Sequence, residues 1–86
     1  MTPSVILYTR PGCCLCDEAR EVLLRVRARV PFTLQERDIE TDDELLRAYL
    51  ERIPVVSVDG REEFELSVDE RELEDVLASP RRANPR

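Results

Sequence analysis

Three cysteines, Cys13, Cys14 and Cys16, lie within four consecutive positions, and they are the only cysteines of the 86-residue chain. Cys13 and Cys16 have the Cys-x-x-Cys spacing, which puts their side chains about one turn apart on a helix. At that separation one thiolate can attack a substrate disulfide and the other thiol can resolve the mixed disulfide. The alternatives are a set of thiolate metal ligands, or small apolar side chains in a core.

Cys13 is the candidate for the attacking sulfur. It follows an Arg-Pro-Gly turn and lies near the N-cap of a predicted helix, where free N–H groups and the helix dipole favour a thiolate. Arg10 adds a nearby positive charge, and Asp17 opposes it. Cys14 lies about 100° around the helix from Cys13, and a disulfide between adjacent residues is strained. We therefore interpret Cys16 as the resolving thiol and Cys14 as a bystander or an alternative thiol.

Composition excludes several other classes of function. The chain has no histidine, so a Cys-His or Ser-His catalytic pair and the usual zinc sites that include histidine are excluded. The formal net charge is -6, which argues against nucleic acid and anionic membrane as partners, since both attract basic surfaces.

A metal or iron–sulfur carrier remains the alternative function. Thiolates bind soft metals, but an iron–sulfur cluster needs about four cysteines. The chain has 3 cysteines, so a cluster would require a dimer or an outside thiol such as glutathione.

The N-terminal segment predicts a cytoplasmic protein. Its apolar run, Val5–Tyr8, is shorter than the run of about 7–15 residues in a secretory signal, or of about 20 in a membrane span. Thiols in the cytoplasm are kept reduced, so clustered cysteines there favour catalysis or metal binding over structural disulfides.

Hydrophobic periodicity predicts seven elements in the order β-α-β-α-β-β-α. The strands and helices are expected, in chain order, at residues 4–8, 14–29, 32–39, 45–50, 55–58 and 61–66, with a last helix after 67–70. The first two strands should pair in parallel through a right-handed crossover, and the last two should form an antiparallel hairpin. This order predicts an α/β protein with a four-stranded mixed sheet and helices on both faces. Residues 1–79 are expected to form one domain, with 80–86 as a flexible tail.

The sequence also predicts the roles of individual residues in these elements. Thr41 and Ser67 begin two capping-box patterns and are the expected N-caps of the second and third helices. The first helix should bury one face made of several apolar residues, which are Leu15, Ala19, Val22, Leu23, Val26 and Val30. In the last strand, Phe64 and Leu66 are expected to face inward.

Two stretches, "ILYTRPGCCLCDEA" and "ERDIETDDELLRAYLERIPVVSVDG", carry a family resemblance. The chain resembles the glutaredoxin-like branch of the thioredoxin superfamily, and in particular the small bacterial glutaredoxin-like proteins with a Cys-x-Leu-Cys site. The resemblance covers about residues 4 to 78. It implies the thioredoxin/glutaredoxin-like fold and a thiol-disulfide oxidoreductase that reduces or exchanges disulfides.

The resemblance also implies roles for individual residues. Cys13 matches the nucleophile and Cys16 the resolving thiol. Pro54 matches the cis-proline opposite the cysteines, so we expect a cis bond before it. Ile53 matches the residue whose backbone pairs with the bound thiol substrate. Arg10 matches the basic residue that helps hold the glutathione carboxylate.

Two departures from the family pattern concern the substrate. Cys14 stands where glutaredoxins usually carry proline or glycine, and the segment 64–70 replaces the Gly-Gly before the last helix with bulkier side chains. The expected substrate is therefore a protein disulfide as much as a glutathione mixed disulfide. We expect no bound cofactor, glutathione as a candidate co-substrate, a reductase or glutathione as electron donor, and a monomer.

Overall fold

A computed structural model describes residues 2–78. Its elements follow the predicted order, with one short 3-10 turn, η1, added before the second helix. The bounds, in chain order, are β1 Ser4–Thr9, α1 Cys14–Arg29, β2 Thr33–Asp38, η1 Ile39–Thr41, α2 Asp43–Tyr49, β3 Val55–Val58, β4 Arg61–Glu65 and α3 Glu70–Ala78. The predicted tail, 80–86, and the last residue of the predicted domain lie outside the described residues.

The four strands form one mixed sheet in the order β2-β1-β3-β4. β1 pairs with β2 in parallel and with β3 in antiparallel fashion, and β3 pairs with β4 as an antiparallel hairpin. Asp59 and Gly60 join that hairpin with φ values of 53° and 86°, the left-handed pair that a tight hairpin turn requires. The predicted α/β fold and strand directions are confirmed.

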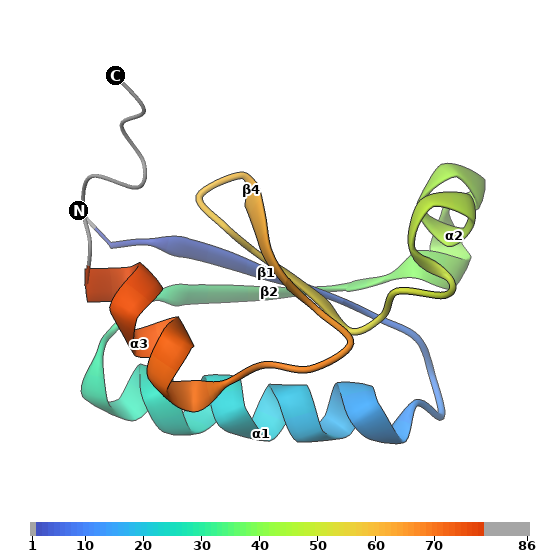
Figure 1. The fold of residues 1–86 in the computed structure, drawn as a ribbon. Coiled ribbons are helices and arrows are strands. Elements are labelled where there is room, and N and C mark those ends of the chain that lie inside the picture. Colours follow the sequence, from blue (N-terminus) through green and yellow to red (C-terminus); the bar gives the residue numbers. More distant parts are fainter. Residues whose placement is uncertain (1, 79–86) are drawn as a thin grey trace.

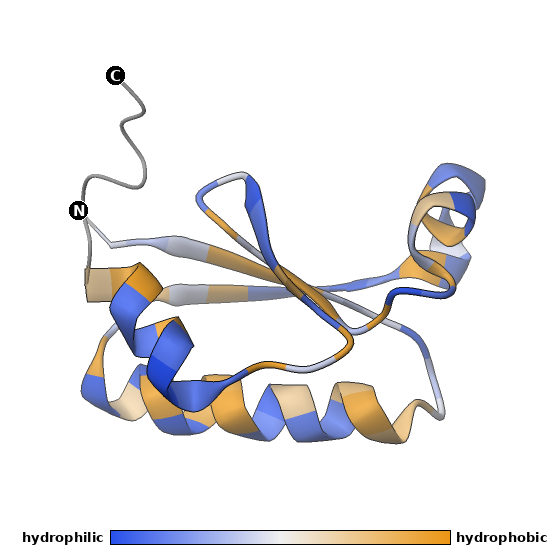
Figure 2. Cartoon of the chain, viewed as in Figure 1, coloured by the Kyte–Doolittle hydropathy of each residue, from blue (hydrophilic) through white to orange (hydrophobic). Residues whose placement is uncertain are grey.

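The helices cover the two faces of the sheet unequally (Figure 1). α1 and α3 pack together on one face, while α2 lies near one end of the strands on the other face, where Tyr49 stacks on Tyr8 of β1. The main core lies between the sheet and α1 with α3, and Figure 2 shows apolar residues of the central strands over that helix. Its buried members are Val5, Leu7, Ala19, Leu23, Val26, Phe32, Val56, Val58 and Leu73.

Both predicted N-caps are wrong by one or two residues. Asp42 caps α2, its carboxylate accepting the N–H of Glu44 at 2.8 Å, while the expected cap, Thr41, ends η1. Asp69 accepts the N–H of Glu72 at 3.1 Å at the start of α3, so Ser67 is not the cap. In each case an aspartate nearer the helix competes with the hydroxyl, and both side chains are good N-cap acceptors.

Two leucines that were expected to be buried are exposed. Leu15 is 49% exposed, because Cys16 is the residue of the first turn of α1 that faces the core. Leu66 is 51% exposed, because β4 ends at Glu65 and the chain turns away there with φ of 73° at Leu66. The simple alternation of β4 does not extend into this turn.

Candidate functional site

The turn after β1 places Cys13 at the start of α1. Gly12 has φ of 80°, a conformation that glycine adopts without a steric penalty, and Cys13 follows in an extended conformation as the N-cap. The Cys13 sulfur accepts the backbone N–H of Cys16 at 3.2 Å. The prediction that Cys13 lies at the helix N-cap is confirmed, and its sulfur occupies the position where N–H groups stabilise negative charge.

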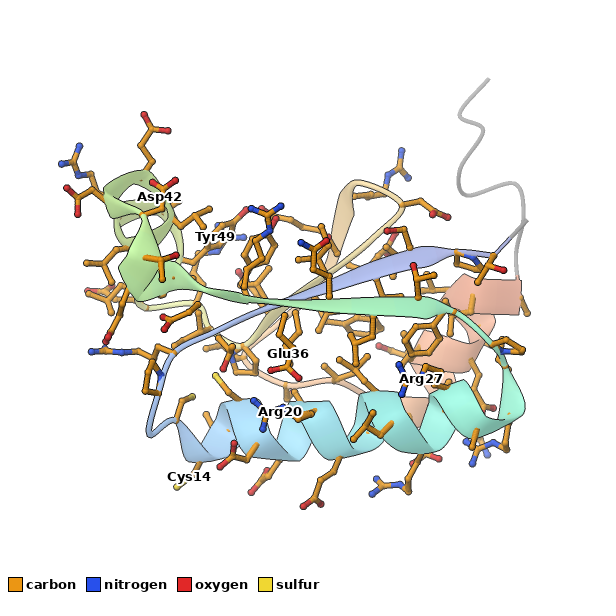
Figure 3. The ribbon with its side chains drawn as sticks, turned by 180° about the vertical axis from the view of Figure 1, so that it is seen from behind. Cys14, Arg20, Arg27, Glu36, Asp42 and Tyr49 are labelled. Atoms are coloured by element: carbon orange, nitrogen blue, oxygen red, sulfur yellow. The ribbon has the colours of Figure 1, made fainter. Side chains whose placement is uncertain are left out.

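The three cysteines differ in burial although they are close in sequence. Cys13 is partly buried, Cys14 is exposed and Cys16 is buried, with 1% of its surface accessible. Figure 3 shows Cys14 on the side of α1 that is turned away from the sheet. Only the Cys13 sulfur therefore combines access to solvent with a hydrogen bond from the helix N-terminus.

Burial raises the pKa of the Cys16 thiol above its ordinary value of 9.0, and the neighbouring side chain of Cys13 raises it further. A hydrogen bond from the Thr9 side chain and one from the Arg10 backbone act in the opposite direction. The net shift favours the neutral thiol, because desolvation disfavours the charged form. Cys16 thus rests as a protonated thiol beside Cys13.

Arg10 lies beside the cysteines but is engaged by an ion pair. Its Nη2 lies 2.7 Å from Oε2 of Glu40, and its Nε donates to the same oxygen at 2.9 Å. A carboxylate ligand would have to compete with Glu40 for this guanidinium. The role of Arg10 in holding glutathione stays a prediction.

Ile53 lies against the cysteines, and the peptide bond between Ile53 and Pro54 is cis, as predicted. Ile53 is buried in one cluster with Cys16 and Ile39, and Cys13 packs against that cluster. The backbone N–H of Ile53 donates to the carbonyl of Tyr49 at 3.0 Å. That donor is already used within the protein, so a substrate backbone would have to displace this bond to reach it.

Thr9 is a site residue that the sequence analysis missed. It is the last residue of β1 and is 8% exposed, and its side chain acts to lower the pKa of the buried Cys16 thiol. A signal was present in the sequence, because Thr9 continues the inward-facing positions of Val5 and Leu7 at a spacing of two. An inward-facing hydroxyl in an apolar environment needs a hydrogen-bond partner, so a threonine at such a position close to the cysteines is a candidate site residue.

The three sulfurs do not form one ligand set. Across residues 2–78, no group of three or more histidine, cysteine, aspartate or glutamate side chains is placed to hold a metal ion. The difference between the exposed Cys14 and the buried Cys16 explains this for the cysteine cluster. The same part of the chain contains no helix long and apolar enough to cross a membrane.

A thioredoxin-type sheet with a Cys-x-x-Cys at the start of α1 defines the class of protein. The family model described as Glutaredoxin-like domain (DUF836) matches residues 4–78. The chain belongs to this glutaredoxin-like family, and the resemblance noted in the sequence is confirmed.

Similar proteins agree with this assignment. An uncharacterized protein of Mycobacterium tuberculosis is 36% identical over 81 residues, which cover 88% of this chain and 84% of that protein. An X-ray structure of a protein from X. campestris is 35% identical, with a TM-score of 0.73, covering 88% of this chain and 99% of that one. A mutant thioredoxin from Halobacterium salinarum is 19% identical with a TM-score of 0.66, covering 87% of this chain and 71% of that one. This last likeness shows a shared fold. The family and the fold indicate a redox type of function.

Proposed function

We propose that the protein is a thiol-disulfide oxidoreductase of the dithiol type. The Cys13 thiolate attacks one sulfur of a substrate disulfide, forms a mixed disulfide with it and releases the other substrate sulfur as a thiolate. Cys16 then loses its proton and attacks the Cys13 sulfur, which releases the second substrate thiolate. The substrate gains two electrons, and the protein is left with a Cys13–Cys16 disulfide.

One observation carries the proposal: the two sulfurs have different environments suited to these two roles. The Cys13 sulfur is accessible and accepts the N–H of Cys16 at 3.2 Å, which stabilises a thiolate. The Cys16 thiol is buried, and its raised pKa keeps it protonated until the mixed disulfide forms. The metal-carrier alternative has no comparable support from the arrangement of the cysteines.

Two features bear on the substrate. Arg10, the residue that the resemblance assigns to glutathione, is paired with Glu40, and the segment 64–70, which replaces the Gly-Gly of the family pattern, carries the bulky and exposed Leu66. We therefore propose a protein disulfide as the substrate, with glutathione as a weaker alternative. A reductase or glutathione would return the Cys13–Cys16 disulfide to the dithiol, and the reaction requires no bound cofactor.

Redox titration against glutathione buffers, read by thiol alkylation and intact mass, tests the proposal. The expected result is a two-electron transition that survives Cys14→Ser and disappears in Cys16→Ser. Cys16→Ser should instead accumulate a mixed disulfide on Cys13. A transition that requires Cys14, or the lack of any transition, would overturn the dithiol function.

A further inference from the structure

An ion pair joins the ends of two neighbouring strands beside the cysteine turn. β1 and β2 run parallel with Thr9 opposite Asp38, so both leave the sheet at the end where Figure 1 shows the turn into α1. Arg10 follows Thr9 directly, and Glu40 lies two residues after Asp38. The Arg10 Nε donates to Oε2 of Glu40 at 2.9 Å, and Nη2 lies 2.7 Å from the same oxygen. The pairing of the strands thus brings the two charges together.

Glu40 has a fixed place next to the cysteine cluster. It is the middle residue of η1, and its backbone N–H donates to Oδ1 of Asp38 at 2.8 Å. The residue before it, Ile39, is fully buried in the cluster that contains Cys16 and against which Cys13 packs. The Glu40 side chain itself is exposed. The core therefore holds the turn against the cysteines while the carboxylate stays at the surface.

Arg10 is the cation of the turn that leads to the attacking sulfur. It begins the Arg-Pro-Gly turn, and Cys13 is the next residue after that turn. Arg20, in the second turn of α1, pairs with Asp17 and with Glu36, each at 2.9 Å. A substrate carboxylate that approaches Cys13 therefore meets two arginines that already have carboxylate partners.

The Arg10–Glu40 pair has a larger effect on charge than on folding. Both side chains are exposed, and an exposed ion pair contributes little to the free energy of unfolding. Beside a reaction centre, however, the Glu40 carboxylate cancels the charge of Arg10 and repels another carboxylate at short range. Charges around a binding site act mainly on the choice of partner and on the rate of association.

We propose that Glu40 is a specificity-determining residue. By occupying Arg10, it makes the site select disulfides with neutral or cationic groups near their sulfurs over disulfides with carboxylates there. This inference rests on the proposed dithiol function and adds the charge class of its substrate. Every such disulfide is reduced to two thiols while Cys13 and Cys16 become a disulfide, so the bonds made and broken are the same and only the charge differs.

The geometry also indicates which cation an anionic substrate would use once Glu40 is neutral. Arg37 on β2 is adjacent to Glu36, which faces α1, so the alternation of the strand turns Arg37 to the opposite face, opposite Tyr8 in the register. Arg10 lies in the turn that leads to Cys13. The freed guanidinium of Arg10 is therefore the expected partner of the substrate carboxylate.

Three small disulfides of different charge test this selection in a Cys14→Ser background. Dithiodipropionate carries carboxylates, hydroxyethyl disulfide is neutral, and cystamine carries ammonium groups. Quenching by alkylation, followed by intact mass, gives the rate constant at which each oxidises the reduced protein. The leaving thiols differ in pKa, so the ratio of each charged disulfide to the neutral one is compared between variants.

The variants separate the pair from net charge. Glu40→Gln removes the carboxylate charge and keeps the shape of the side chain. Glu44→Gln, on the exposed start of α2, makes the same change in net charge outside the pair and is the matched control. The melting temperature of each variant checks that the fold is intact, since an exposed pair should change it little.

We expect Glu40→Gln to raise the ratio for dithiodipropionate by about fivefold, the size of one charge interaction at a protein surface. The ratio for cystamine should fall on the same scale. Added salt should reduce both changes, because it screens exposed charges, and Glu44→Gln should leave both ratios within about twofold of the starting protein.

The double variant Arg10→Gln/Glu40→Gln identifies the source of the gain. It removes both charges of the pair, so the ratio for dithiodipropionate should return to within about twofold of the starting protein. A gain that persisted without Arg10 would overturn the proposal, because the freed guanidinium could not be its cause.

The remaining outcomes distinguish this inference from the function on which it rests. An unchanged ratio in Glu40→Gln, or an equal rise in Glu44→Gln, would overturn the role of Glu40 and leave the dithiol function standing. If none of the disulfides converted Cys13 and Cys16 to a disulfide in the Cys14→Ser protein, the dithiol function itself would fail, and this inference with it.

Discussion

At the scale of single residues, the three cysteines at the start of α1 lie in three different environments. Cys13 lies at the helix N-cap with a partner N–H, Cys14 faces solvent, and Cys16 is enclosed by the core. Thiol reactivity depends on the thiolate fraction and on access, and both depend on the environment of the sulfur. The three cysteines therefore differ in chemistry because of the contacts that their positions in the fold create.

Alkylation of the reduced protein should follow this difference. Iodoacetamide is expected to modify Cys14 and Cys13 before Cys16, because the Cys16 sulfur is buried and its pKa is raised above 9.0. Time-resolved intact mass with peptide mapping at several pH values measures the order. In urea-unfolded protein, which serves as the control, the three rates should converge. Early modification of Cys16 in the folded protein would contradict its burial.

Leu66 should be a point of backbone strain. Its φ of 73° lies in the left-handed region, which costs a residue with a Cβ about 1–2 kcal/mol, and its side chain is half exposed. Replacement by glycine would relieve this cost, but the greater entropy of glycine in the unfolded chain offsets part of the gain. Leu66→Gly should therefore raise the free energy of unfolding by about 0.5–1 kcal/mol. Urea denaturation measures this value.

Leu66→Ala is the matched control, because it removes the same exposed side chain and retains the Cβ. It should be no more stable than the wild type. Equal stability of the two variants would contradict the strain at this position.

At the scale of elements, side chains tie the end of α2 to the β3–β4 hairpin. The Tyr49 hydroxyl donates to Glu62 at 2.7 Å, and Arg52 lies over the Tyr49 ring, 5.2 Å from its centroid. Arg52 also pairs with Glu62 at 2.5 Å and with Glu65 at 2.6 Å. Arg52 directly precedes Ile53, so this network fixes the segment that lies against Cys16.

Tyr49 should reveal this network through its titration. The hydrogen bond to Glu62, and then partial burial, raise the pKa of Tyr49 from 10.0 to about 12. The contribution of the neutral phenol to stability is fully present below the pKa of tyrosine in the unfolded chain. It is lost as the pH rises through the higher pKa of Tyr49 in the folded protein. Ultraviolet absorbance of phenolate in a Tyr8→Phe variant isolates the transition of Tyr49.

Glu62→Gln is the informative comparison for this titration. It removes the negative charge beside the hydroxyl, so the midpoint of Tyr49 should move back toward 10.0, the ordinary value. Glu72→Gln, a charge change on α3 outside the network, should leave the midpoint unchanged. If Glu62→Gln did not lower it, the bond between Tyr49 and Glu62 would not control this group.

At the scale of the whole molecule, two apolar clusters hold the layers together, and surface ion pairs link neighbouring elements. The larger cluster joins the sheet to α1 and α3, and the smaller one joins the cysteine turn to η1, α2 and the Ile53 segment. Across the surface, Arg29 pairs with Glu70 at 2.5 Å and also with Glu74, which links α1 to α3. Figure 3 shows Arg20 reaching toward Glu36, a pair 2.9 Å apart that links α1 to β2.

Acid should destabilise the fold by protonating the carboxylates of two ion-paired residues, Glu62 and Glu70. The bonds from Tyr49 and Arg52 lower the pKa of Glu62, and those from Arg29 and Arg25 lower the pKa of Glu70, both from 4.5. A carboxylate whose pKa is lower in the folded protein contributes stability above its pKa in the unfolded chain. That stability is lost as the pH falls through the pKa of the folded protein. We therefore expect the melting temperature to hold above pH 4.5 and to fall below it.

A Glu62→Gln/Glu70→Gln double variant checks the source of this acid dependence. Its melting temperature near neutral pH should be slightly lower than that of the wild type, because exposed pairs contribute little. The difference should shrink as the pH drops, and added salt should reduce it at neutral pH. A difference that is constant with pH would assign the acid sensitivity to other groups.

Much of the fold was predictable because its signals are local. The alternation around Val5 and Leu7, the helical spacing of Ala19 and Leu23, and the Asp-Gly turn each specify a structure over a few residues. The misplaced caps and leucines show the limit of such signals. Two adjacent acceptors compete for one helix end, and an element that ends one residue early turns Leu66 outward.

For the site, the sequence by itself determined that Cys13 begins a helix directly after a strand and that Cys16 lies one turn further on. Spacing and helix geometry suffice for this, since both act within a few residues. Tertiary structure alone decided that Cys16 is buried against the end of β1 and that Arg10 pairs with Glu40. These two contacts join separate elements, so chain folding has to bring the partners together before either environment exists.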